Sequence, residues 1–300
     1  MSIHYQESGN ISWMGSQRRG KAIALVEIEK KRVGNWKTGS HSRIVFRRAN
    51  MFQHVEDIAD LPTKLTELGV TAAIKQRGSI LIKVNLPSPP TPDHPKSDPH
   101  LIRAVAEYAL KLGASCAIAE AANGFLHDNL RCSGLLEFVQ DSKIEVLDLD
   151  QVVAAQVVVN GEVHYLPTCL QAYGVRMAIP LTSKRTERTL FSNNVKVFVG
   201  ATPRRFYQEG QSPVPRPRIH ENLHQSVANI YRAIMQYAPF HYYINGGMAE
   251  FYNRGVIPLG SIYVGDNACE LDRFICRLFD IREPEYLDYL VASTDDLSPI

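Results

Sequence analysis

Residues 80–84 read Ile-Leu-Ile-Lys-Val, and residues 115–121 read Ser-Cys-Ala-Ile-Ala-Glu-Ala. Both are short, mostly apolar runs, which is typical of strands whose two faces are covered by helices. Between them lies the clearest helix signal of the chain: Asp98 is a suitable N-cap, Pro99 suits the first helical position and Gly113 ends the segment. This strand–helix–strand order predicts a parallel pair of strands joined by a right-handed crossover.

The same alternation extends to both sides of this unit. Further strands are predicted near residues 22–28 and 144–149, and helices over residues 54–69 and 128–140. We expect the four strands to lie in one sheet. The predicted fold class is therefore α/β, with a mostly parallel sheet flanked by helices.

The second half of the chain departs from this rhythm. A β-hairpin insertion is predicted over residues 151–170, because Asn160-Gly161 is a two-residue turn signal between alternating apolar positions. Residues 201–219 contain four prolines and four arginines, and this Pro/Arg-rich segment is predicted to be a loop without regular structure. The remaining predicted elements are strands at 175–181, 195–199, 241–244 and 261–264, and helices at 223–237, 268–279 and 284–292.

Composition limits the class of protein. Hydrophobic residues make up 45% of the 300 residues and charged residues 21%, which excludes a disordered or fibrous chain. The 33 Lys+Arg and 31 Asp+Glu residues leave a net charge of +2, so no nucleic-acid partner is expected. We expect one mixed α/β body over residues 1–300, with a basic strand or hairpin region at 1–50.

Sequence features also indicate where the protein works. There is no apolar segment of signal-peptide or membrane-span type, so no membrane partner is expected. The five cysteines are odd in number and include no CxxC pair, which favours reduced thiols in the cytoplasm. Neither a GxGxxG nor a GxxxxGK[ST] loop occurs, and no cofactor is expected.

Candidate site residues stand at the strand ends, because open parallel sheets bind ligands beyond the carboxyl ends of their strands. Lys83 lies in an otherwise apolar strand, and Asn85 follows it. Either the Lys83 ammonium reaches water at the sheet rim, or it binds an anion or transfers a proton. Glu120, near the end of the next strand, is either a base or hydroxyl ligand, or a partner in a loop ion pair.

Two further groups of residues have both a functional and a structural interpretation. His220 and His224 have the spacing of a metal-binding pair, but no third ligand is evident and no metal site is expected. The four arginines of residues 201–219 either bind phosphate or carboxylate, or form a solvated loop.

Several segments together resemble the family of proteins grouped as domain of unknown function 362. They include Ile-Leu-Ile-Lys-Val-Asn-Leu at 80–86, Ser97-Asp98-Pro99, Ile244-Asn245-Gly246-Gly247 and Pro258-Leu259-Gly260. The positions that match the family pattern are Lys83, Asn85, Asp98, Lys184, Lys196, His220 and Asp266. The resemblance implies an α/β fold and a cytoplasmic protein. Many relatives carry a ferredoxin-like cysteine segment that this chain lacks, so no iron–sulfur cluster is expected.

These observations lead to a functional hypothesis: a small-molecule enzyme of isomerase, lyase or cyclase type that acts by proton transfer on an anionic metabolite. The expected catalytic residues are Lys184, His220 and Lys83. The expected substrate-binding residues are Asn85, Glu120, Lys196, Arg204, Arg205 and Asn245. Two alternatives stay open: a non-catalytic binding protein for an anionic ligand or protein partner, and a redox accessory that has lost its iron–sulfur segment. A homo-oligomer is compatible with either class.

Overall fold

The computed structural model describes residues 45–48, 58–86, 96–208 and 216–291. These residues belong to two compact units: the main unit runs over Ser42–Arg273 and Glu283–Ile300, and the other includes Phe274–Arg282. The predicted strand at 22–28 and most of the basic region at 1–50 lie outside the described residues, so the single body over 1–300 stays a prediction.

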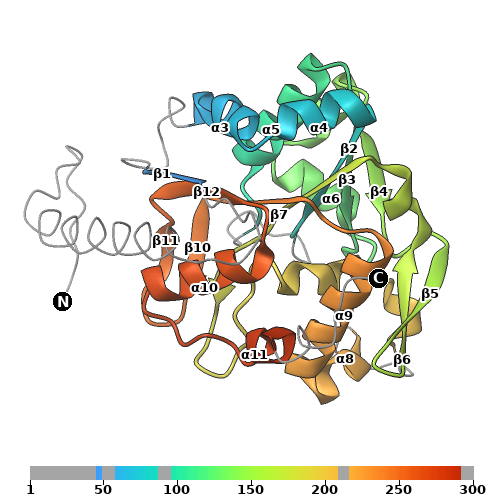
Figure 1. Ribbon diagram of the computed structural model, residues 1–300, viewed down its shortest axis with the longest axis vertical. Helices are drawn as coiled ribbons and strands as arrows, with labels where there is room; N and C mark the ends of the chain where they lie inside the picture. Colours follow the sequence, from blue (N-terminus) through green and yellow to red (C-terminus); the bar gives the residue numbers. More distant parts are fainter. Residues whose placement is uncertain (1–44, 49–57, 87–95, 209–215, 292–300) are drawn as a thin grey trace, which may run out of the picture. The chain divides into compact units, whose positions relative to one another are not determined.

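A seven-stranded sheet forms the centre of the main unit (Figure 1), in the order β1-β12-β9-β7-β2-β3-β4. Its five parallel strands are β2 (Ser79–Val84), β3 (Ser115–Glu120), β4 (Glu145–Asp148), β7 (Val175–Ile179) and β9 (Tyr242–Asn245). β12 (Ser261–Gly265) runs antiparallel to β9, and β1 (Val45–Arg48) antiparallel to β12. The predicted mostly parallel α/β sheet is confirmed.

The helix expected after Asp98 is α5 (Pro99–Lys111), and its ends are set by the residues that predict it. The Asp98 carboxylate accepts hydrogen bonds from the backbone N–H groups of His100 and Leu101, and Gly113 takes a left-handed conformation with φ of +80°. Such an N-cap satisfies donors that the first helical turn leaves free.

In the described residues, the other two predicted helical segments contain short helices separated at glycines. The segment 54–69 contains α3 (Leu61–Glu67), and the unpredicted α4 (Val70–Arg77) begins directly after Gly69, whose φ is +80°. The segment 128–140 is divided into α6 (Leu126–Cys132) and α7 (Leu136–Asp141) around Gly134, whose φ is +69°. A glycine adopts this conformation without steric cost, so each chain reversal falls at a glycine.

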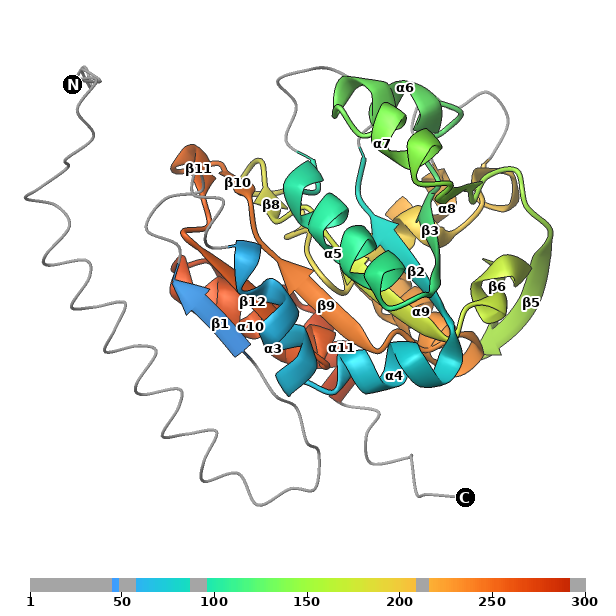
Figure 2. The same ribbon diagram turned by 90° about the horizontal axis from the view of Figure 1, so that it is seen from above.

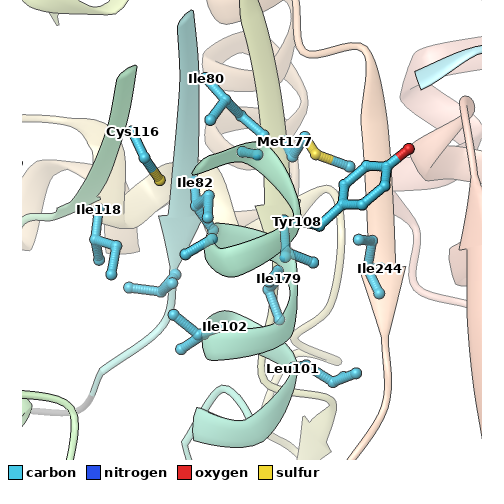
Figure 3. Close-up of a cluster of buried hydrophobic side chains, with 14 of the residues drawn as sticks. Ile80, Ile82, Leu101, Ile102, Tyr108, Cys116, Ile118, Met177, Ile179 and Ile244 are labelled. Carbon is cyan, nitrogen blue, oxygen red and sulfur yellow. The ribbon is translucent and has the colours of Figure 1, made fainter. Parts of the chain in front are cut away.

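Successive side chains of β2 point to opposite faces of the sheet. Ile80, Ile82 and Val84 join the main hydrophobic cluster, and Figure 3 shows Ile80 and Ile82 in one cluster with side chains of α5 such as Tyr108 and Ile102. Because side chains alternate along a strand, Lys83 faces the opposite side. On that side of the sheet lies α9 (Leu223–Tyr237), whereas α3, α4 and α5 cover the first side (Figures 1 and 2).

Two small sheets complete the described strands. The predicted hairpin is confirmed as β5 (Ala154–Val159) and β6 (Glu162–Pro167), with Asn160 and Gly161 at φ of +50° and +77° in the turn. A three-stranded sheet was not predicted; it joins β8 (Ser183–Lys184), β10 (Met248–Phe251) and β11 (Gly255–Pro258).

The structure corrects two predictions for the region between β8 and α9. Residues 195–199 are not a strand but part of η2 (Lys196–Ala201), a 3₁₀ helix that buries Val197 and Phe198. A short apolar run is compatible with either element, so the pattern alone did not separate them. Within 201–219, the described residues include η3 (Arg204–Phe206) and α8 (Pro217–Glu221), so this segment is not wholly irregular.

The last described helices are α10 (Ala268–Leu278) and α11 (Tyr286–Val291). Within the described ranges, no helix combines the length and apolar character needed to cross a membrane.

Candidate functional site

Lys83 and Glu120 meet at the carboxyl ends of the neighbouring parallel strands β2 and β3. The Lys83 ammonium donates to Oε1 of Glu120 over 3.1 Å and to the carbonyl oxygen of Val84 over 2.7 Å. The side chain of Lys83 is fully buried and that of Glu120 is 5% exposed. The lysine that the sequence places in an apolar strand therefore has a charged partner, 37 residues away in the chain.

The Glu120 carboxylate is held by the backbone as well. Its Oε1 accepts from the N–H of Ala121 over 2.8 Å, and its Oε2 accepts from the N–H of Leu86 over 3.2 Å. These bonds fix the carboxylate across the ends of both strands.

Burial drives both members of this pair toward their neutral forms. It lowers the pKa of Lys83, although the charge of Glu120 and their hydrogen bond act in the opposite direction. Burial likewise raises the pKa of Glu120, against the opposing effect of Lys83. A buried lysine and carboxyl group with converging pKa values can share one proton in two arrangements.

Gly200 of η2 lies directly against the pair. A β-carbon at this position would stand 2.5 Å from Glu120 Oε1 and 3.1 Å from Lys83 Nζ. The carbonyl oxygen of Gly200 also accepts from the N–H of Ala121 over 3.0 Å. The 3₁₀ helix therefore approaches the strand ends closely only because this residue has no side chain.

A second buried ion pair, Arg216–Asp150, stands at the same edge. Asp150 follows β4 and accepts from the N–H groups of Asn123 and Arg204 over 2.9 and 2.6 Å. Arg216 lies 3.4 Å from Asp150 and donates to the carbonyl oxygen of Thr202 over 2.8 Å. Sequence reasoning missed Asp150, because an acidic residue after a strand is common and only the fold brings Arg216 to it.

Ser97 connects β2 with β7, where the chain order of the parallel strands changes direction. Its hydroxyl accepts from the N–H of Asn85 and donates to the carbonyl oxygen of Ile179. In doubly wound sheets such a reversal is where ligands bind. Asn85 is thus placed at the predicted edge, with its backbone anchored by Ser97.

A network of buried polar side chains lies beside these groups, at the carboxyl end of β9. Asn245 ends β9 and hydrogen-bonds to Asn193 and Asn194, and Asn194 in turn donates to Asp272. All four residues are fully buried. Among the members of this network, only Asn245 was predicted to be functional.

The remaining predicted residues occupy different elements. Lys196 opens η2 and is partly buried, Lys184 lies on β8 opposite Phe251 of β10, and His220 is exposed on α8. The structure brings Lys83 and Glu120 into direct contact but places Lys184 in the separate three-stranded sheet. Convergence of Lys184 and His220 on Lys83 stays a prediction.

Two of the predicted anion-binding arginines use their donors within the protein. Arg205 donates to the carbonyl oxygens of Asp150 and Val152 over 2.8 and 2.6 Å. Arg204 donates through Nε to Gln208 over 3.1 Å. Both residues therefore help to hold the segment after η2 against the loop that follows β4.

Within the described residues, no three His, Cys, Asp or Glu side chains are arranged to hold a metal ion.

Comparison with known proteins identifies the family of the chain. No curated protein matches the chain. A family model described as "Domain of unknown function (DUF362)" matches residues 80–277, which include the strands β2, β3, β7 and β9 together with the site at their carboxyl ends. Since the match covers well over half of the 300 residues, the chain belongs to the DUF362 family.

Proposed function

We propose that the protein is a small-molecule enzyme that transfers a proton to or from an anionic metabolite, with Glu120 as the proton-transferring group and Lys83 as its positioning partner. The observation that carries this proposal is the buried contact of 3.1 Å between the two side chains at the carboxyl ends of β2 and β3. Many isomerase, lyase and cyclase reactions include a proton transfer of this kind.

The division of roles follows from exposure. The Glu120 side chain retains 5% exposure whereas Lys83 retains none, so we assign to the carboxyl group the role that needs contact with the substrate. The nearby Lys83 ammonium favours the ionised form of Glu120 and lowers its pKa, whereas burial favours the neutral acid and raises the pKa. Opposing influences of this kind bring a carboxyl group toward the pKa range in which a general acid or base works at neutral pH.

Lys196 is the proposed contact for the anionic part of the substrate. It is a member of η2, the element whose Gly200 adjoins the pair. A cytoplasmic location is part of the proposal, supported by the absence of any disulfide among the five cysteines, all of which are described. We also propose that the partner is a small molecule rather than nucleic acid, in keeping with the net charge of +2.

Hydrogen–deuterium exchange at carbon tests this proposal without knowledge of the full reaction. The protein is incubated in D₂O with a panel of small hydroxy-, oxo- and phosphorylated carboxylic acids, and loss of C–H signals is followed by ¹H NMR. We expect exchange of a hydrogen next to the carboxyl or carbonyl group of at least one compound. Glu120→Gln should reduce the rate at least 100-fold, because an amide cannot accept the proton.

The exposed Lys75→Met variant is the matched control for handling and folding and should exchange at the wild-type rate. Exchange that persists in Glu120→Gln contradicts the assigned role. Ligand binding without exchange in the wild-type protein favours the alternative, a non-catalytic binding protein for an anionic ligand.

A further inference from the structure

The buried amides at the carboxyl end of β9 orient one another. The carboxylate of Asp272 accepts from the side-chain nitrogen of Asn194 over 3.0 Å, and Asn245 Oδ1 accepts from the same nitrogen over 2.9 Å. Asn193 Oδ1 then accepts from the side-chain nitrogen of Asn245 and, over 3.0 Å, from the hydroxyl of Thr182. Each amide is oriented by its neighbour, and Asp272 sets the direction of the whole chain of hydrogen bonds.

With the amides in this orientation, two polar side-chain atoms of the network have no hydrogen-bond partner among the described residues. The side-chain nitrogen of Asn193 and the side-chain oxygen of Asn194 are buried and have no hydrogen-bond partner in the described structure. Flipping either amide would face donor with donor or acceptor with acceptor elsewhere in the network. Buried polar atoms are nearly always paired, so a free donor and a free acceptor on consecutive residues need an explanation.

Lys196, two residues further on, adds a cation. It is partly buried, and within the described part of the chain its ammonium makes no hydrogen bond or ion pair. Burial, with a smaller effect of the Arg185 charge, lowers its pKa to about 8. Unlike Lys83, it has no carboxylate beside it, and its nitrogen is not among the buried unpaired atoms of the described residues, so the ammonium is open to solvent and to a ligand.

The segment from Asn193 to Gly200 crosses the carboxyl ends of four parallel strands. Asn194 contacts Asn245 at the end of β9, and Gly200 adjoins Glu120 at the end of β3. β9 and β3 are separated by β7 and β2, which corresponds to three strand spacings or about 14 Å. Lys196 precedes Gly200 by four residues of 3₁₀ helix, about 8 Å along its axis. Along this segment, Lys196 thus lies between Asn194 of the amide network and Gly200, which adjoins the Lys83–Glu120 pair.

We propose that Asn193, Asn194 and Lys196 form the anchoring site for a small hydroxycarboxylate. The Lys196 ammonium pairs with the carboxylate of the ligand. The unpaired side-chain N–H of Asn193 donates to an oxygen of that carboxylate, and Asn194 Oδ1 accepts from the hydroxyl group of the ligand. A compound with one anionic group and one hydroxyl satisfies all three unused groups. The reaction that follows binding rests on the proposed function. The binding of a hydroxycarboxylate at this site does not.

Isothermal titration calorimetry with matched acids tests the site. The probes are glycolate against acetate and malate against succinate, because the members of each pair differ only in the hydroxyl group. We expect each hydroxy acid to bind about tenfold more tightly than its partner, since without the hydroxyl the buried Asn194 oxygen stays unpaired. Inorganic phosphate, added separately, is expected to bind more weakly than either hydroxy acid.

Lys196→Met separates binding from folding. It should weaken hydroxy acid binding at least tenfold while the melting temperature stays equal or rises, because no protein partner of the ammonium is lost. Lys75→Met, the same change at an exposed site, should alter neither property. Asn193→Asp, which replaces the free donor with an acceptor, should also weaken binding.

Three results would overturn the inference: equal binding of the hydroxy acids and their partners, unchanged binding in Lys196→Met, or tighter binding of phosphate. Loss of C–H exchange with binding retained would instead refute the proposed proton transfer and leave this site intact, so the two failures are distinguishable.

Discussion

At the scale of the residue, the Lys83–Glu120 pair shows what a sequence can and cannot reveal. An ionisable side chain within Ile-Leu-Ile-Lys-Val signals a special position, since an unpaired buried ammonium is costly. The identity of its partner depends on the register between β2 and β3, in which Lys83 lies opposite Ala119 and next to Glu120. Gly200 belongs to the segments that resemble the family, but its contact with Glu120 is set by the tertiary fold. Asp150 could not be identified from sequence, because acidic residues in loops are common.

A double-mutant cycle measures the coupling of this pair. Lys83→Met should lower the free energy of unfolding by about 3 kcal/mol, because Glu120 is left buried without its ammonium partner. Glu120→Gln should cost about 3 kcal/mol as well, because the Lys83 ammonium is left buried without its carboxylate and one backbone N–H group loses its acceptor. The double variant should be about 1–2 kcal/mol more stable than the sum predicts, since neither buried charge remains. The measurement is urea denaturation at pH 7, and strict additivity would contradict a direct interaction.

At the scale of the element, local signals predicted the ends of some helices closely. α9 spans Leu223–Tyr237, as its apolar periodicity predicts, and α5 begins directly after Asp98. The sequence pattern predicted a strand where the structure has η2. An element of six residues is too short for its apolar residues to show the periodicity of a helix or a strand. Its conformation depends on contacts with residues distant in sequence, such as the approach of Gly200 to Glu120.

The N-cap of α5 offers a quantitative test at this scale. Asp98→Ala should lower the free energy of unfolding by about 1 kcal/mol, because the N–H groups of His100 and Leu101 lose their acceptor. Asp98→Asn retains a side-chain oxygen and should cost a few tenths of a kcal/mol. Both values come from chemical denaturation, and equal losses in the two variants would show that the charge, not the cap, stabilises the helix.

At the scale of the whole molecule, the two edges of the parallel sheet differ in chemistry. The carboxyl ends carry the paired and unpaired polar groups of the candidate site, with Glu120 and Asn245 as examples. At the amino ends, Arg77 and Arg176 are held by backbone carbonyl oxygens, including those of Gly174 and Pro239. The parallel direction of the strands was predictable from the alternation of strands and helices. It identified the carboxyl edge of the sheet as the place of the candidate site. The pairing of groups across that edge required the tertiary structure.

His241, at the amino edge of the parallel sheet, makes the stability of the fold depend on pH. Its Nδ1 accepts from the N–H of Arg176 over 3.1 Å, and the Arg77 guanidinium lies 2.8 Å from Nε2. Burial, followed by the charges of Arg176 and Arg77, lowers the pKa of His241 from 6.5 to about 4. Both ring nitrogens thus face donors, and a neutral imidazole has one lone pair to accept from them. A proton added to that lone pair would break the hydrogen bond accepted there and place a third positive charge beside two arginines.

The folded state therefore binds this proton less tightly than the unfolded chain does, and the linked stability is present above pH 6.5 and lost as the pH falls toward 4. Allowing for solvent screening at this partly exposed ring, the loss should be about 2 kcal/mol. We expect urea denaturation at intervals between pH 7.5 and 4.5 to show the wild-type protein losing this amount relative to His241→Gln, which keeps an acceptor for Arg176 but does not titrate. All other titrating groups are common to both proteins, so parallel stability curves would mean that the pKa of His241 is not lowered by folding.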